Sequence, residues 1–170
     1  MGWVMARPNV FGGQFDYDAD DPPGYRSGQV RIGAGAGGAE LNVRLYEIPP
    51  GESLCPYHYE YVEEWLVVLR GELELRGHDE TSTVGDGDVV CFPPGPAGAH
   101  KLTNKRDGSA RILMFSSAAE PAVAVYPDND KVGVWSGNPD DNFIFRRRDG
   151  RRQYYDGEHQ HPTQTDPQDI

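Results

Sequence analysis

The chain has 170 residues, which suits one domain with a sizeable core. It carries 27 acidic and 16 basic side chains, and its net charge of -11 argues against nucleic acid or anionic lipid as a partner. Its 21 glycines and 14 prolines interrupt the chain every few residues, which favours an all-β domain of short strands over a helical bundle.

The N-terminal residues, MGWVMARPNVFGGQ, lack the basic region and the apolar run of a secretory signal. The longest apolar run, WLVVL at 65–69, is far shorter than the roughly 18 residues of a membrane span. We therefore expect a cytoplasmic protein that does not enter membranes. In a reducing compartment, Cys55 and Cys91 are expected to be packed thiols, with a disulfide as the alternative.

Residues 1–28 show no steady periodicity, and we interpret them as an irregular N-terminal arm. Glycines 33, 35 and 38 have the G-x-G-x-x-G spacing of a dinucleotide-binding turn, which requires a helix directly after it. The following segment, ELNVRLYEI at 40–48, alternates apolar and polar residues as a strand does. We therefore expect a flexible turn between strands and no nucleotide site.

Further strands are predicted at regular intervals, with a tight hairpin at Gly71. Their segments are EEWLVVL (63–69), LELRG (73–77), TSTV (81–84), DVVCF (88–92), AHKLTN (99–104), ARILMFSS (110–117) and AVAVYP (122–127). This even spacing predicts a closed barrel or a double-sheet jelly roll over residues 29–127. Residues 128–170 form a C-terminal extension, and we expect its last part to be disordered.

The segment PYHYE at 56–60 places chemically active residues where a strand usually has inert polar ones. His58 and Glu60 are two positions apart, so an extended backbone projects both to one side, and Glu64 shares their parity. Glu63 is the alternative to Glu64, because a β-bulge would exchange the two faces. His100 begins another strand and completes a set of two imidazoles and two carboxylates. Such a set suits a divalent ion that prefers oxygen ligands.

At these residues the sequence resembles the cupin superfamily. The first family motif is matched by Gly51, His58, Glu60, Glu64 and Gly71. The second motif is matched by Gly87, Pro93, Gly95, His100 and Asn104. The segment before His58 is one residue longer than the pattern, and the loop before His100 is two residues longer. The larger departure is Glu60, which stands where the family usually has its second histidine.

The resemblance implies a single-domain, cupin-type jelly-roll β-barrel with a divalent metal ion, Mn, Fe, Ni or Zn, at its centre. The implied ligands are His58, Glu60, Glu64 and His100. Two carboxylates would cancel the charge of the ion, making it a weaker Lewis acid and favouring a hard metal. The alternative is a pocket without metal, in which Glu60 hydrogen-bonds to one of the two histidines.

The resemblance also implies a metal-dependent enzyme that acts on a small organic molecule. Dioxygenase, isomerase and lyase reactions all occur on this fold, which does not select among them. The alternative is a noncatalytic module that binds or senses a small ligand. Exposed barrel edges and the aromatic extension predict a homodimer. We interpret the basic run RRRDGRR at 146–152 as a solvated surface or a partner for the chain's own acidic segments.

Overall fold

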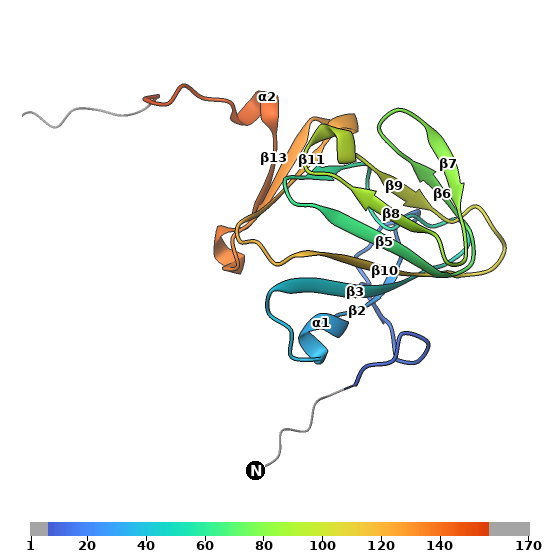
Figure 1. The fold of residues 1–170 in the computed structure, drawn as a ribbon. Coiled ribbons are helices and arrows are strands. Elements are labelled where there is room, and N and C mark those ends of the chain that lie inside the picture. The colour runs from blue at the N-terminus through green and yellow to red at the C-terminus, as the bar shows by residue number, and fades with distance from the viewer. Residues whose placement is uncertain (1–6, 157–170) are drawn as a thin grey trace, which may run out of the picture.

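The structure is a computed structural model that describes residues 7–156, and Figure 1 shows its strands wrapped around a common interior. The strands are β1 (Asp16–Tyr17), β2 (Gly28–Val30), β3 (Leu41–Ile48), β4 (Tyr59–Glu60), β5 (Glu64–Arg70), β6 (Leu73–Arg76), β7 (Thr81–Val84), β8 (Val89–Phe92), β9 (Lys101–Thr103), β10 (Ala110–Ser117), β11 (Ala122–Tyr126), β12 (Lys131–Trp135) and β13 (Phe143–Arg146). The helices are α1 (Ile32–Gly35) and α2 (Arg147–Gly150), with 3-10 turns η1 (Pro96–Gly98), η2 (Pro127–Asn129) and η3 (Pro139–Asp141). The all-β prediction is confirmed.

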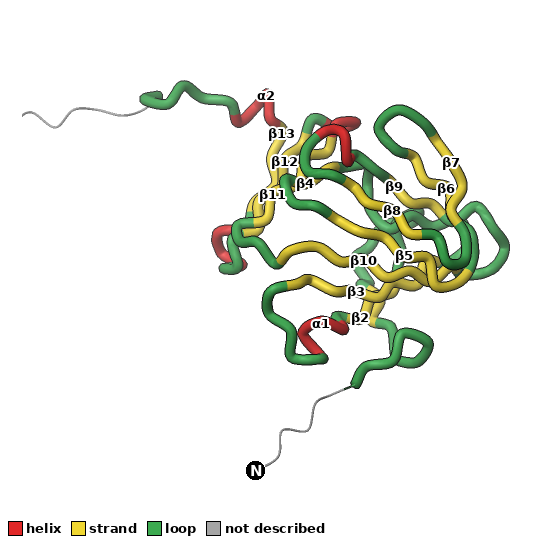
Figure 2. Tube along the Cα trace, viewed as in Figure 1, coloured by secondary structure: helices red, strands yellow, loops and turns green. Residues whose placement is uncertain are grey.

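The largest sheet has the strand order β1-β2-β3-β10-β5-β8. Its centre is β10, which pairs antiparallel with β3 along its whole length and with β5 on its other side. A second sheet has the order β13-β12-β11-β4, and a third has the order β7-β6-β9. Figure 2 shows these strands, in yellow, enclosing the interior with loops at both ends.

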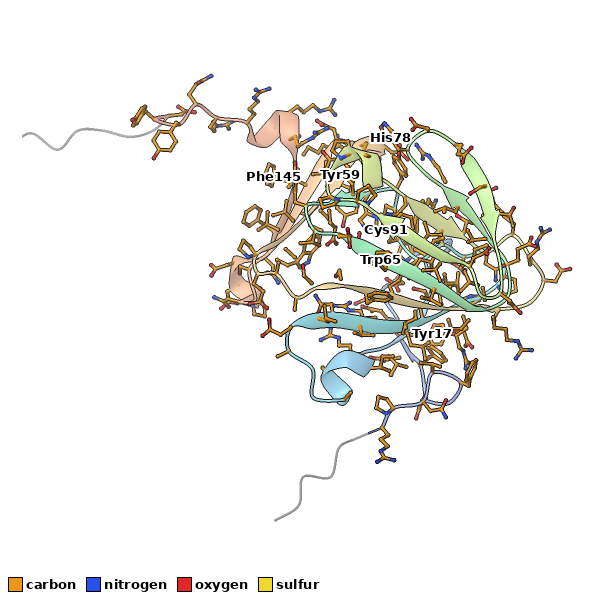
Figure 3. All side chains as sticks on the ribbon, viewed as in Figure 1. Tyr17, Tyr59, Trp65, His78, Cys91 and Phe145 are labelled. Atoms are coloured by element: carbon orange, nitrogen blue, oxygen red, sulfur yellow. The ribbon has the colours of Figure 1, made fainter. Side chains whose placement is uncertain are left out.

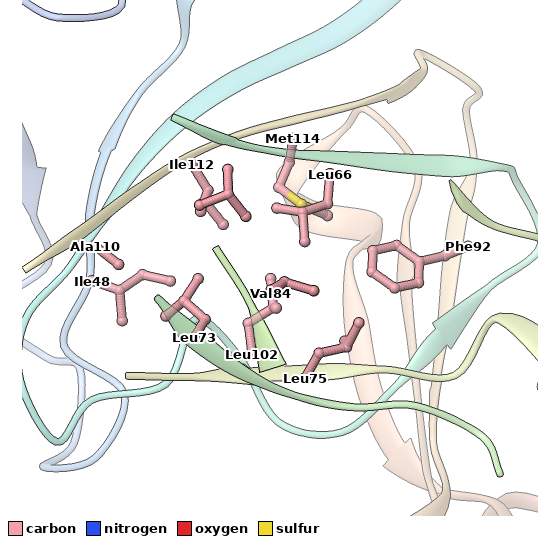
Figure 4. Close-up of a cluster of buried hydrophobic side chains, with 11 residues drawn as sticks. Ile48, Leu66, Leu73, Leu75, Val84, Phe92, Leu102, Ala110, Ile112 and Met114 are labelled. Carbon is pink, nitrogen blue, oxygen red and sulfur yellow. The ribbon is translucent and has the colours of Figure 1, made fainter. Parts of the chain in front are cut away.

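The apolar core fills one part of this interior (Figure 4). Leu66 on β5 and Ile112 on β10 are fully buried because alternate residues of both strands face inward. Leu75 and Leu102 meet them from the third sheet. Phe92 belongs to the same cluster and also stacks on His100, with ring centroids 3.7 Å apart. The core therefore borders directly on one of the predicted metal ligands.

Two local predictions differ from the structure. The glycine-rich segment after β2 contains the helical turn α1, where Gly33 packs closely against the backbone of Val43. The predicted hairpin at Gly71 is also wrong, because β5 pairs with β8 and β10, whereas β6 pairs with β7 and β9. Gly71, with a φ of +91°, carries the chain from one sheet to the next and lies against Ala110.

The predicted C-terminal extension begins with structure that continues the barrel. β12 pairs with β11 along its whole length, and β13 adds the outer strand of the same sheet. The disorder predicted for the last part of the extension falls on residues 157–170, which lie outside the described residues. Within residues 7–156, no helix is long and apolar enough to cross a membrane.

The loop before His100 depends on a glycine. A Cβ added at Gly98 would overlap the backbone carbonyl oxygen of Pro93, which cannot move without displacing the loop. We expect Gly98→Ala to lower the free energy of unfolding by about 1–3 kcal/mol, as overpacking does elsewhere. Gly35→Ala is the control, because nothing lies within 4 Å of its added Cβ. Urea unfolding measures both variants, and equal midpoints would contradict the prediction.

Candidate metal centre

A backbone bridge brings the two predicted histidine ligands together. His58 and His100 pair as an isolated antiparallel bridge, in which the amide N of each donates to the carbonyl O of the other, over 3.1 and 2.8 Å. Their imidazole ring centroids lie 4.8 Å apart, and both residues are buried. Two segments that are distant in sequence thus present their imidazoles to one place.

Glu64 completes a compact group with these histidines. One ligand atom from each of His58, Glu64 and His100 lies within 4.8 Å of the other two. Glu64 is the first residue of β5, and its side chain lies on the same face of the strand as Leu66. The carboxylate of Glu63 instead accepts a hydrogen bond from Trp65 Nε1 at 2.7 Å, on the exposed side. Of the two neighbouring glutamates, the structure therefore groups Glu64 with the histidines.

Both imidazoles are oriented by a carbonyl two residues earlier in the chain. His58 Nδ1 lies 3.1 Å from the Pro56 carbonyl O, and His100 Nδ1 lies 2.9 Å from the Gly98 carbonyl O. Because a carbonyl only accepts, each Nδ1 carries the proton and each Nε2 keeps a lone pair. His100 Nε2 is buried and has no hydrogen-bond partner among the described residues. An oriented imidazole with a free buried Nε2 is the arrangement of a metal ligand.

The electrostatics of the group also suit a cation. Burial, reinforced by the charge of Glu60, raises the pKa of Glu64 to about 8. Burial, reinforced by His58, lowers the pKa of His100 to about 4. Each shift reflects the cost of a buried charge, and a divalent cation between the three groups would favour the carboxylate and the neutral imidazoles. The residues present therefore fit a divalent metal ion.

Glu60 lies near this group but outside it. It lines the same cavity from β4 and is half-buried, but its carboxylate is not among the three groups within 4.8 Å of one another. Burial raises its pKa, and the charge of Arg44 opposes that rise. In the described part of the chain, the hydrogen bonds of His58 and His100 go to other partners. Its role as a fourth ligand stays a prediction.

The group opens into a cavity of about 810 Å³. Sequence reasoning missed the rest of its lining, which includes Arg44, Tyr46, Cys55 and Tyr126. The Tyr126 ring stacks on His58 with centroids 5.9 Å apart, and Cys55 Sγ lies 3.4 Å from His58 Nδ1. The alternating polar residues at 42, 44 and 46 could have indicated that β3 lines the cavity. Such alternation was not read this way because polar residues of a strand usually face solvent.

A sequence model of the cupin domain matches residues 44–116, which include all four predicted ligands. Residues 44–116 are thus a cupin domain, and the described structure has the cupin fold. No curated protein matches this cupin by sequence.

Among solved structures, this cupin is similar to a candidate sugar phosphate isomerase from Acidithiobacillus ferrooxidans, with 22% identity, a TM-score of 0.74, and coverage of 85% of this chain and 92% of that one. A sugar phosphate isomerase of the cupin superfamily from Silicibacter pomeroyi has 24% identity, a TM-score of 0.68, and coverage of 76% and 82%. The polyketide cyclase RemF from Streptomyces resistomycificus has 21% identity, a TM-score of 0.57, and coverage of 70% and 84%. At these identities the likeness establishes the fold alone.

We expect the wild-type chain to bind Mn, Fe, Ni or Zn stoichiometrically, and Glu64→Gln or His100→Ala to weaken that binding by more than about tenfold, because each removes a ligand. His78→Ala is the matched control, since His78 lies on the surface beyond β6 (Figure 3). Elemental analysis and calorimetric titration measure the metal content and affinity. Equal affinity in the control and ligand variants would exclude the site.

Glu60→Gln tests the fourth ligand separately. If Glu60 moves onto the ion, the variant loses metal affinity; the same titration with unchanged affinity would instead assign Glu60 to the cavity wall. Circular dichroism checks that the variant folds, and the His78→Ala protein again gives the reference affinity.

Proposed function

We propose that this cupin binds a divalent metal ion through His58, Glu64 and His100, with Glu60 as the fourth ligand, and acts on a small organic molecule. The observation that carries the proposal is the convergence of the first three residues with a buried Nε2 left free on His100. Imidazole and carboxylate ligands without thiolate suit Mn, Fe, Ni or Zn. Cys55 is in the cavity, but its Sγ faces the protonated Nδ1 of His58 and lies outside the ligand group.

Among the reactions known on this fold, we favour isomerisation of an oxygen-rich substrate. The two solved structures with TM-scores of 0.74 and 0.68 carry the name of sugar phosphate isomerase, which supports this choice. A bound divalent ion would polarise a carbonyl or hydroxyl oxygen of the substrate.

The residues around the ligand group suit such a substrate. Burial, together with the charges of Cys55, Glu60 and Glu64, raises the pKa of Tyr126 to about 12. The Tyr126 hydroxyl therefore keeps its proton at neutral pH and can donate a hydrogen bond. Asn42 and Ser116, which line the cavity from paired positions on β3 and β10, add polar groups that can hold further oxygen atoms.

The proposal predicts deuterium incorporation from solvent during isomerisation. Metal-loaded protein is incubated in D2O with aldoses and ketoses, with and without phosphate groups, and proton NMR follows loss of the signal beside the carbonyl. Glu64→Gln should abolish this exchange, whereas His78→Ala should leave it unchanged. Saturable binding with neither exchange nor interconversion of aldose and ketose across the panel would favour the alternative, a noncatalytic ligand-binding cupin.

We also propose that the chain forms a homodimer through β13. This strand pairs with β12 on one side only, and its other edge is the end of the sheet. Phe143, Ile144 and Phe145 are all exposed, at 51%, 57% and 37%, so apolar groups meet solvent on both faces. Figure 3 shows Phe145 at the outside of the molecule, where an edge strand of a second copy could pair with it. The cytoplasmic location stays a prediction from the sequence.

If this dimer forms, Ile144→Arg should shift the protein to monomer, because an exposed guanidinium would replace an apolar contact. Tyr154→Glu is the control, since Tyr154 is exposed but lies outside β13. Light scattering after size exclusion measures the mass of each. A wild-type monomer, or a dimer that survives Ile144→Arg but not Tyr154→Glu, would exclude β13 as the interface.

A further inference from the structure

Arg44 occupies a special place in the metal-site cavity. On β3, Asn42, Arg44 and Tyr46 all line the cavity, whereas Ile48 on the same face belongs to the apolar core. Arg44 is half-buried at the middle of the strand. It is therefore a cation inside the cavity wall, whereas Arg31, the other arginine of the lining, is exposed.

The strand register sets the position of Arg44 relative to the ligand group. Asn42 pairs with Ser116, which pairs with Glu64 on the far side of β10. Arg44 lies two residues further along β3, level with Met114. Two strand spacings and a two-residue offset place the Cα atoms of Arg44 and Glu64 roughly 12 Å apart. Since both side chains project into the cavity, the space between their ends suits a molecule of only a few atoms in length.

The guanidinium of Arg44 has spare hydrogen-bonding capacity. Among the described residues, Arg44 takes part in none of the ion pairs within 4.0 Å; the arginines that do are Arg76, Arg106, Arg111, Arg147, Arg148 and Arg152. Arg44 Nη1 donates a long hydrogen bond to Gln29 Oε1 over 3.4 Å, and the guanidinium also interacts with the Tyr46 hydroxyl. A guanidinium has five N–H donors in a planar fork, so several remain for a ligand. That fork matches the paired oxygens of a carboxylate or phosphate.

Arg44 shares the cavity with several acidic residues. Asp18, Asp21, Glu60 and Glu120 also line it and repel anions. Glu60 and Arg44 line the same cavity from β4 and β3, so the Glu60 carboxylate can compete for the guanidinium. Should Glu60 turn to the metal as the fourth ligand, Arg44 would be left without a nearby carboxylate. An anionic group of a ligand would then take the place of Glu60 beside Arg44.

We propose that Arg44 recognises an oxyanion, carboxylate or phosphate, at one end of a small ligand whose other end meets the metal-binding group through a hydroxyl or carbonyl oxygen. This inference rests on the proposed function, because it places the ligand in the same cavity. It narrows the substrate class from oxygen-rich molecules in general to short anionic ones.

The test separates the anion site from the metal site by using metal-free protein. Inorganic phosphate and acetate are titrated into wild type, Arg44→Met, Arg44→Lys and Glu64→Gln, with binding followed by calorimetry and by amide NMR shifts. We expect Arg44→Met to weaken anion binding by about 10- to 100-fold, the usual value of hydrogen bonds to a charged group. Arg44→Lys should restore part of the loss, because it keeps the charge but not the fork.

The control for nonspecific attraction is Arg70→Met. Arg70 is also an arginine of the large sheet, on β5, but it is exposed and lies outside this cavity. The Arg70→Met variant should bind phosphate and acetate with the same affinity as wild type. Comparing the affinities of wild type for phosphate and for acetate shows whether the site prefers a phosphate or a carboxylate group.

Failure of the inference differs from failure of the proposed function. Anion binding that is unchanged by Arg44→Met, equally weakened by Arg70→Met, or absent from wild type at millimolar anion would overturn the role of Arg44, whatever the metal titrations give. Conversely, Arg44-dependent anion binding in a chain that takes up no metal would uphold the anion site and reject the metal-dependent function. Glu64→Gln, which should lose metal but keep anion binding, makes this separation within one protein.

Discussion

The site depends on the backbone bridge between His58 and His100. Two reciprocal hydrogen bonds hold these residues opposite each other, and in each case the imidazole is oriented by the carbonyl two positions earlier. The same arrangement, an imidazole bound to the carbonyl two residues earlier, therefore occurs at both His58 and His100, on opposite sides of the bridge. Because backbone carbonyls bind each Nδ1, the buried Nε2 of His100 remains available for a ligand.

Single strands of the barrel carry both cavity-lining residues and core residues on their inward face. On β5, Glu64 faces the cavity, while Leu66 and Val68 on the same face belong to the core. On β3, Arg44 faces the cavity and Ile48 the core. Phe92 lies at the border, contacting the core and stacking on His100. On β3 and β5, the core residues thus lie two to four residues from the side chain that faces the cavity. Their packing limits how far Arg44 and Glu64 can move.

Apolar, β-branched runs between glycine-containing turns predicted strands such as β5 and β10, and the alternation of apolar and polar residues predicted β3. Strand parity also selected Glu64 over Glu63, which the structure places on the outer side. The same reasoning did not foresee that Glu60 lies outside the compact group, since β4 is only two residues long and parity does not extend across the turn that follows it. Arg44 was missed because Leu45, on the opposite face of β3, is fully buried, so that both faces of this strand are covered.

The pairing of β4 has a consequence for where the folding unit ends. β4, which carries Glu60, pairs with β11 at Tyr59 and Glu60, and β11 lies beyond the residues matched by the family sequence model. A recombinant fragment cut to residues 44–116 would keep His58, Glu64 and His100 but would strip β4 of its hydrogen-bonded neighbour. It would also lose Val125, which packs with Tyr57 and Tyr59 behind the site. The segment matched by the family model is thus smaller than the folding unit, and a truncated chain has to retain at least β11, which ends at Tyr126.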